Sequence, residues 1–211
     1  MKAPCVVIVM AKAPVPGYAK TRLIPALGAV RAAQLADRLL QHALGAALQA
    51  QLGPVDLCCA PDRHHPLLQA HRQQGGLVLS NQGAGDLGER MSRAFDRWSP
   101  RADRILMTGT DAPALDALVL QRAAQSLDDV DAVFVPTLDG GYALVGLRRA
   151  APSLFVDVAW STPQVMAQTR QRVAQAGLSH VELACLPDID EPSDLQHLPP
   201  GWLDWALRCA D

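Results

Sequence analysis

Three cations lie within one short segment that contains no acidic residue. Lys12, Lys20 and Arg22 share this segment, called the opening loop (residues 12–23), with Gly17. The loop follows an apolar run that reads as a buried strand and precedes a helical pattern. A positive loop after the first strand of an α/β fold is a place where phosphate-bearing ligands bind. We therefore expect Lys12, Gly17, Lys20 and Arg22 to form a phosphate-binding loop.

Carboxylates follow other predicted strands. Asp111 and Asp139 lie in Gly- and Pro-containing loops, and Asp188 and Asp190 flank a single residue near the C-terminus. Loops after parallel strands share one edge of a sheet, so the opening loop and residues 81–90, 109–113 and 188–194 should converge there. Asp188 and Asp190 point to one side of an extended chain, an arrangement of like charges that is costly without a cation. Because Mg²⁺ binds carboxylates together with substrate phosphates, the pattern fits a metal-bound phosphate ligand.

Each of these features also has a purely structural interpretation. The three cations of the opening loop could form a solvated surface. Asp111 could cap a helix or fix the turn at Pro113, and residues 139–141 (Asp-Gly-Gly) form a good turn sequence. Asp194 is better explained as a cap or first-turn acid of the last helix. Trp160 could belong to an acceptor pocket, but a core position is the favoured interpretation.

Composition and missing motifs exclude several classes of function. The net charge is −2, which argues against a general nucleic-acid-binding protein. The opening loop matches neither a Walker A motif nor G-x-G-x-x-G, and the chain has no G-x-S-x-G and no H-E-x-x-H pattern. The N-terminal apolar run is too short for a signal peptide or a membrane span. The five cysteines form no C-x-x-C pair, so we interpret them as reduced core residues of a cytoplasmic protein.

Strand patterns alternate with helix patterns along the whole chain. The predicted strands are 5–10, 55–60, 77–80, 104–107, 131–136, 142–147 and 180–186. The predicted helices are 29–51, 66–74, 87–98, 116–127, 162–176 and 202–209. This alternation predicts one α/β domain over residues 1–211, with three α/β/α layers and a mostly parallel central sheet. The strands at 131–136 and 142–147 are too close for a crossover helix, so a local hairpin-like or edge arrangement should break the parallel order.

Five motifs, in order along the chain, resemble a bacterial family known as DUF2064, or radical-SAM/selenodomain-associated transferase 1. The motifs are K-x-P-x-x-G-x-x-K-T-R-L at 12–23, D-L-G-E-R-M at 86–91, G-x-D-x-P at 109–113, D-G-G-Y at 139–142 and D-x-D-x-x-x-D-L at 188–195. The resemblance implies a GT-A-like nucleotide-diphosphosugar transferase fold. This fold is related to glycosyltransferases and to nucleotidyltransferases such as the phospholactate guanylyltransferases. Some relatives are associated with arsenosugar biosynthesis.

The resemblance also implies roles for individual residues. By similarity, the cations of the opening loop contact nucleotide phosphates, and Asp111 is the metal-binding acid after the central strand. Asp188 and Asp190 match acids that bind metal in guanylyltransferase-like relatives. The chain departs from the family at Ala143, where typical members have a second tyrosine. It also has one acid at Asp111 where glycosyltransferases of this fold have D-x-D, which is closer to the nucleotidyltransferase branch.

The sequence thus predicts a Mg²⁺-dependent (or Mn²⁺-dependent) transferase that uses a nucleotide donor and a small-molecule acceptor, without a nucleic-acid or membrane partner. Glycosyl transfer from a nucleotide sugar is the first hypothesis, with catalytic roles for Asp111 and, as acceptor base, Asp139. Asp111, Asp188 and Asp190 are the predicted metal ligands. Nucleotidyl transfer from a nucleoside triphosphate to a phosphorylated acceptor is the alternative. A nucleotide-binding module without turnover is the third possibility.

Overall fold

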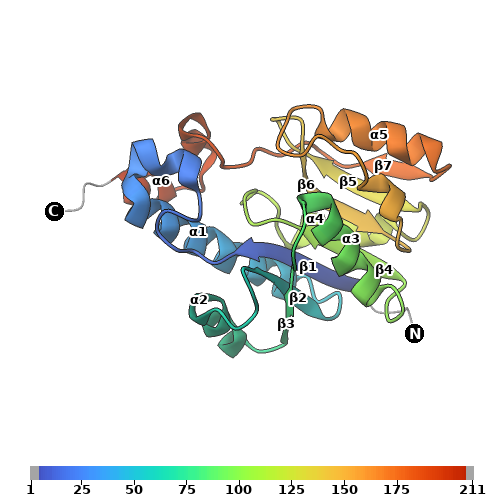
Figure 1. Ribbon diagram of the computed structural model, residues 1–211, viewed down its shortest axis with the longest axis horizontal. Coiled ribbons are helices and arrows are strands. Elements are labelled where there is room, and N and C mark those ends of the chain that lie inside the picture. The colour runs from blue at the N-terminus through green and yellow to red at the C-terminus, as the bar shows by residue number, and fades with distance from the viewer. Residues whose placement is uncertain (1–4, 208–211) are drawn as a thin grey trace.

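The computed structural model describes residues 5–207 and places a seven-stranded sheet between helices (Figure 1). The strand order is β3-β2-β1-β4-β6-β5-β7. The strands are β1 (Cys5–Lys12), β2 (Val55–Ala60), β3 (Leu77–Asn81), β4 (Arg104–Thr108), β5 (Ala132–Pro136), β6 (Tyr142–Leu147) and β7 (His180–Glu182). The α-helices are α1 (Ile24–Gln49), α2 (Pro66–Gln69), α3 (Leu87–Trp98), α4 (Ala117–Ser126), α5 (Val165–Gln175) and α6 (Trp202–Leu207). The predicted mostly parallel α/β architecture is confirmed.

Strand β1 lies in the interior of the sheet because it can be buried on both faces. Its residues from Cys5 to Val9 are at most 1% exposed, as a continuous apolar run in a parallel sheet predicts. It pairs in parallel with β2 on one side and with β4 on the other, where Val9 lies opposite Thr108. The loops that follow β1 and β4 therefore leave the same edge of the sheet, side by side.

Strand β6 is the one antiparallel member among the described strands. It runs between β4 and β5 and is antiparallel to both. Only residues 137–141 separate β5 from β6, which is too short for a crossover connection and forces a hairpin. The predicted break in parallel order is correct, and the structure places it inside the sheet rather than at its edge.

Two groups of helices cover the two faces of the sheet. Leu44 of α1 and Leu120 of α4 belong to one buried cluster, and Phe95 of α3 and Val173 of α5 belong to another on the opposite face. A third cluster joins the first half of α1 to residues 189–206. Figure 1 shows this contact as α6, in red, beside the blue first turns of α1.

Several predicted boundaries differ from the structure. Helix α1 begins at Ile24 instead of residue 29, because a helical turn precedes the non-helical Gly28 (φ 74°) that interrupts it. Residues 66–74 form the short α2 and then a 3₁₀ segment. In the region 180–186, β7 spans three residues and Leu186 makes an isolated bridge to Thr137.

Two further expectations concern the C-terminal half of the chain. Helix α5 begins at Val165, three residues after the predicted start. The predicted end of the last helix, Cys209, lies outside the described residues. The core assignment is wrong for Cys185, which is exposed because the chain has left the sheet after β7; the other described cysteines are free and buried. Among residues 5–207, no helix is both long and apolar enough to cross a membrane.

The β5–β6 turn is also the docking point for α5. Gly140 has φ 89°, and a Cβ at this position would lie 2.3 Å from the carbonyl oxygen of Pro163. Its own carbonyl accepts a hydrogen bond of 2.8 Å from the Met166 amide in the first turn of α5. The Asp-Gly-Gly sequence therefore has a structural function beside any chemical one.

We expect Gly140→Ala to lower the free energy of unfolding by about 2 kcal/mol or more, since a side chain there meets backbone and strains a left-handed residue. Urea unfolding followed by circular dichroism measures this change. Gly45→Ala is the matched control, because Gly45 is helical and a Cβ there has no neighbour within 4 Å. The control should raise stability by up to ~1 kcal/mol. Equal stability of the two variants would contradict the role assigned to Gly140.

Candidate functional site

A cavity of about 620 Å³ lies at the carboxyl edge of β1 and β4. It gathers residues that the sequence singled out in four separate segments. Those that line it are Lys12, Lys20, Arg22, Asp111, Asp139, Asp188 and Asp190. The parallel topology brings them together, because the loops after β1, β4 and β5 and the segment after β7 all reach this edge of the sheet.

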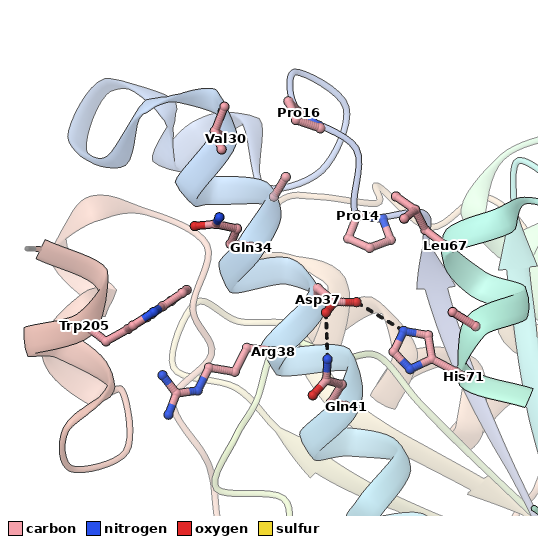
Figure 2. Close-up of a pocket in the computed structure, with 12 residues that line it drawn as sticks. Pro14, Pro16, Val30, Gln34, Asp37, Arg38, Gln41, Leu67, His71 and Trp205 are labelled. Carbon is pink, nitrogen blue, oxygen red and sulfur yellow. Dashed lines mark hydrogen bonds and ion pairs between the residues drawn. The ribbon is translucent and has the colours of Figure 1, made fainter. Parts of the chain in front are cut away.

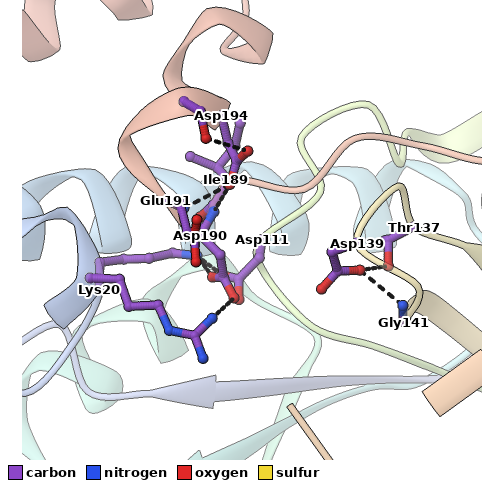
Figure 3. A network of polar contacts seen from close by, with 11 residues as sticks. Lys20, Asp111, Thr137, Asp139, Gly141, Ile189, Asp190, Glu191 and Asp194 are labelled. Carbon is purple, nitrogen blue, oxygen red and sulfur yellow. Dashed lines mark hydrogen bonds and ion pairs between the residues drawn. The ribbon is translucent and has the colours of Figure 1, made fainter. Parts of the chain in front are cut away.

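Lys20 is at the centre of the polar contacts in this cavity (Figure 3). Its ammonium lies 2.7 Å from Asp111 and 2.8 Å from Asp190, and it also donates to the Ile189 carbonyl. The side chain is 7% exposed. Burial alone would lower the pKa of Lys20, but the two carboxylates outweigh it and hold the pKa above its ordinary value. Lys20 therefore joins carboxylates in this structure instead of presenting a free charge to phosphate.

Arg22 and Lys12 are the more open cations of the opening loop. Arg22 is 56% exposed and lies 3.7 Å from Asp190. The Lys12 ammonium lies 5.9 Å from the centre of the Tyr18 ring, and no carboxylate in the described part of the chain is within ion-pair distance of it. Both can donate to an anion in the cavity. Gly17 does not line the cavity; at φ 79° it belongs to the turn that brings the chain back toward Lys20.

Asp111 is fixed at the end of β4 by neighbours on two sides. Its carboxylate accepts a hydrogen bond from the Thr110 hydroxyl at 3.0 Å, and its backbone carbonyl accepts one of 2.8 Å from the Ile189 amide. Asp116, not Asp111, caps α4, through a bond of 2.9 Å from Val119. The capping interpretation of Asp111 is thus wrong, and its side chain remains 42% exposed in the cavity.

The segment that carries Asp190 is held by Asp194. The Asp194 carboxylate accepts hydrogen bonds from the amides of Asp190 at 3.0 Å and Glu191 at 2.7 Å. Asp194 is a first-turn acid, as the sequence indicated, but of the 3₁₀ helix Pro192–His197 and not of α6. This contact fixes the backbone next to Asp190, and thus the carboxylate that Lys20 binds.

Asp139 and Asp188 line the same cavity, and neither forms an ion pair with a cation in the described part of the chain. One oxygen of Asp139 accepts hydrogen bonds from the Thr137 hydroxyl at 2.6 Å and the Gly141 amide at 2.9 Å (Figure 3). Burial raises the pKa of Asp188 to about 6, with further contributions from the negative charges of Asp139 and Asp190. A cation bound near these carboxylates would relieve that repulsion.

The predicted metal ligands are divided between two places in the cavity. Asp111 and Asp190 hold Lys20, whereas Asp188 lies near Asp139, and no group of three or more His, Cys, Asp or Glu residues within 5–207 is arranged to hold a metal ion. The carboxylate oxygens of Asp111 and Asp190 nevertheless bind one cationic group, the Lys20 ammonium, between them. Since Mg²⁺ commonly takes one or two carboxylates and completes its shell with phosphate and water, this pair fits a divalent cation.

Among the further residues that line the cavity are two from segment 81–90, for which no individual role was predicted, and Trp160, for which an acceptor pocket was the less favoured interpretation. Gln82 is 5% exposed, and its side-chain amide donates to the backbone carbonyls of Ala11 and Cys58 at 3.1 and 3.0 Å. Arg90 in the first turn of α3 also lines the cavity. Both belong to segment 81–90 after β3, which the sequence already placed at this edge of the sheet. Trp160, for which a core position was favoured, lines the cavity as well.

The Trp160 ring lies between Tyr142 on one side and Gly88 on the other. It packs edge-on against Tyr142, with ring centres 6.4 Å apart. On the other side, a Cβ at Gly88 would lie 2.8 Å from the indole nitrogen and 2.3 Å from the Phe155 carbonyl. The glycine of the D-L-G-E-R-M motif thus leaves room for the segment that carries Trp160.

A second cavity of about 940 Å³ lies between α1, α2 and α6 (Figure 2). Its carboxylate, Asp37, already accepts hydrogen bonds from His71 at 3.1 Å and Gln41 at 2.7 Å. Its cation, Arg38, stacks over Trp202 and over Trp205, 4.1 and 5.1 Å from their ring centres. These groups are engaged with one another, and none of the predicted site residues lines this cavity.

Solved structures resemble the chain over almost its full length. A Desulfovibrio desulfuricans G20 protein described as a nucleotide-diphospho-sugar transferase matches with a TM-score of 0.85 and 27% identity, covering 97% of this chain and 94% of that one. A Mycobacterium tuberculosis H37Rv protein solved in complex with manganese has a TM-score of 0.58 and 18% identity, covering 92% of this chain and 97% of that one. The second likeness concerns the fold alone.

Sequence comparison adds a curated relative and a family. The 2-phospho-L-lactate guanylyltransferase of Methanothermobacter thermautotrophicus is 27% identical over 137 residues, which cover 65% of this chain and 60% of that protein. The match thus spans less than two thirds of the relative. The family model for uncharacterised proteins conserved in bacteria, DUF2064, matches residues 35–162, and the chain belongs to this family.

Proposed function

We propose that the chain is a nucleotide-dependent transferase that works with a divalent cation and moves a sugar from a nucleotide-diphosphate donor to a small-molecule acceptor. One observation carries the proposal of a nucleotide transferase. A single cavity collects the cations of the opening loop and four aspartates from distant segments. The structural relative from D. desulfuricans, which matches over nearly the whole chain, supports a nucleotide-sugar donor.

The donor phosphates would bind on the side of the opening loop. Lys12 and Arg22 line the cavity with open donor groups, so they can neutralise an anion placed there. Asp111 and Asp190 would hold Mg²⁺ or Mn²⁺, with Asp188 nearby. A bound divalent cation supplies charge stabilisation for the departing phosphate. The contribution of the opening loop is of the same electrostatic kind and needs no covalent intermediate.

The acceptor would bind on the opposite wall. Trp160 and Ser161 line the cavity and offer an aromatic face and a hydroxyl group, whereas the neighbouring Thr162 hydroxyl donates to the Ala159 carbonyl. Asp139 presents its carboxylate there in a fixed orientation, because one oxygen is held by Thr137 and Gly141. We assign to its second oxygen the proton of the acceptor hydroxyl, the role of a general base.

Nucleotidyl transfer is the second candidate, and two observations favour it. The segment after β4 offers one acid, Asp111, where D-x-D is usual for sugar transfer, and the curated relative is a guanylyltransferase. In this reaction a phosphorylated acceptor attacks a nucleoside triphosphate and releases pyrophosphate. The same cavity residues would serve, with the opening loop holding a longer phosphate chain.

A panel of ligands should separate these reactions. Nucleoside triphosphates and nucleotide-diphosphate sugars are added with Mg²⁺ or Mn²⁺, and the melting temperature is followed. A ligand at one hundred times its Kd stabilises the folded state by about 2.7 kcal/mol. We expect the largest rise with a nucleotide sugar; a larger rise with a triphosphate would move the assignment to nucleotidyl transfer. Absence of any rise across the panel would contradict both candidates.

Arg22→Ala should weaken the binding of the best nucleotide at least about tenfold, because a charged hydrogen-bond partner of the phosphates is lost. Calorimetric titration measures the Kd. Arg101→Ala is the matched control, since Arg101 is exposed and does not line the cavity. If both variants bound the nucleotide like the unmodified chain, the opening loop would have no part in donor binding.

Asp111→Asn should remove the part of nucleotide affinity that depends on Mn²⁺, about one order of magnitude or more, while affinity without metal stays. Titrations with and without Mn²⁺ give the two values. The control is Asp96→Asn, an exposed position on α3 outside the cavity. A non-catalytic nucleotide-binding module predicts the opposite result, namely no change of the Mn²⁺ dependence in Asp111→Asn.

A further inference from the structure

Lys20 uses all the donors of its ammonium group within the protein. An ammonium has three N–H donors, and Lys20 has three acceptors: the carboxylates of Asp111 and Asp190 and the carbonyl of Ile189. The side chain is 7% exposed. In this state the lysine has no donor left for a phosphate, although it belongs to the opening loop.

The backbone of Lys20 adopts an unusual conformation that accompanies these side-chain contacts. Lys20 is in the left-handed region, at φ 49° and ψ 44°. For a residue with a side chain this conformation costs roughly 1–2 kcal/mol. The contacts of the Lys20 side chain offset this cost, together with the hydrogen bond that the Lys20 carbonyl accepts from the Leu23 amide at 3.0 Å. A lysine that left the two carboxylates would lose this reason to stay in a left-handed conformation.

The oxygens that hold the ammonium are the ones a divalent cation would need. One oxygen of Asp111 and one of Asp190 lie within 2.8 Å of the same nitrogen atom. A metal ion bound by these oxygens at about 2.1 Å would occupy nearly the same point. Two cations cannot share that point, because like charges in contact repel strongly.

We infer that Lys20 is a resident cation that competes with the divalent cation for Asp111 and Asp190. With the cavity empty, its ammonium compensates both carboxylates. A divalent cation binds there when the ammonium leaves. The released side chain then joins Lys12 and Arg22, which line the same cavity, and can reach the phosphates of a donor. This inference rests on the proposed function, since it concerns the divalent-cation site of the same cavity.

The consequence is that metal and donor favour each other's binding. A divalent cation alone must displace an ammonium that has no new anionic partner. A donor phosphate supplies that partner, because it attracts the released ammonium. Lys20 thus lowers the affinity for the divalent cation in the absence of nucleotide. When nucleotide is present, Lys20 moves to the phosphates and no longer opposes metal binding.

The test is a Mn²⁺ titration of the nucleotide-free protein, with free Mn²⁺ followed by electron paramagnetic resonance. Lys20→Met should bind Mn²⁺ at least about tenfold more tightly than the unmodified chain. A cation next to a carboxylate lowers the affinity of that carboxylate for another cation, the proton, by about one to three powers of ten, and we expect an effect of the same sign on Mn²⁺. The matched variant Lys12→Met removes the same charge from the same cavity without opening the carboxylate pair. It should give a distinctly smaller gain.

Adding Asp190→Asn to Lys20→Met should abolish most of the gain, which locates the Mn²⁺ at this pair. Equal or weaker Mn²⁺ binding by Lys20→Met, or a gain as large in Lys12→Met, would overturn the inference. The absence of Mn²⁺ binding by every variant would also overturn it. Because no nucleotide is present, a failure of the proposed function would appear in the ligand panel and leave these comparisons readable.

A second measurement uses the unmodified chain, in case Lys20→Met leaves the half-exposed carboxylates of Asp111 and Asp190 unpaired and does not fold. With ¹⁵N-labelled lysine, the Lys20 ammonium should give a signal protected from solvent exchange in the metal-free protein. Saturation with Mg²⁺ together with inorganic pyrophosphate should shift this signal, because the ammonium exchanges its carboxylate partners for phosphate. A signal whose position and protection are unchanged at saturation would show that the ammonium stays between the carboxylates, contrary to the inference.

Discussion

The ion pairs of Lys20 with Asp111 and Asp190 join three parts of the chain that are far apart in the sequence. Lys20 follows β1, Asp111 follows β4, and Asp190 lies in the segment after β7. The sheet fixes the first two, because β1 and β4 are paired in parallel. The third is brought in by the bond from Ile189 to Asp111 and by the buried side chain of Ile189. The shape of the cavity depends on this junction.

Much of the fold follows from the sequence, because alternation of apolar strands with amphipathic helices leaves few arrangements. The convergence of distant loops at one edge follows too, since parallel strands share their carboxyl ends. The pairing of Lys20 does not follow. It depends on a left-handed residue and on partners up to 170 positions away, and no local pattern encodes either. Charge and position indicated a phosphate-binding lysine, whereas the structure shows one enclosed by carboxylates.

For Trp160 and Asp139 as well, the sequence alone does not predict the full role of the residue. A tryptophan next to hydroxyl residues is compatible with a core or with a pocket, and here it packs on Tyr142 and also lines the cavity. The Asp-Gly-Gly turn likewise combines two functions. Gly140 admits α5 against the turn, while the carboxylate of Asp139 faces the cavity. Sequence patterns describe one residue at a time, so they present such double roles as alternatives.

The charges that line the cavity indicate whether a nucleotide donor would bind with or without a divalent cation. Four cations (Lys12, Lys20, Arg22 and Arg90) face four carboxylates (Asp111, Asp139, Asp188 and Asp190). The cavity is therefore close to neutral when all are ionised, and a polyphosphate would bring uncompensated negative charge into it. On the proposed function, a donor that enters with a divalent cation restores the balance, and the inferred exchange of Lys20 from carboxylate to phosphate would keep each carboxylate paired. This balance favours a metal-bound nucleotide over a free one as the species that the site accepts.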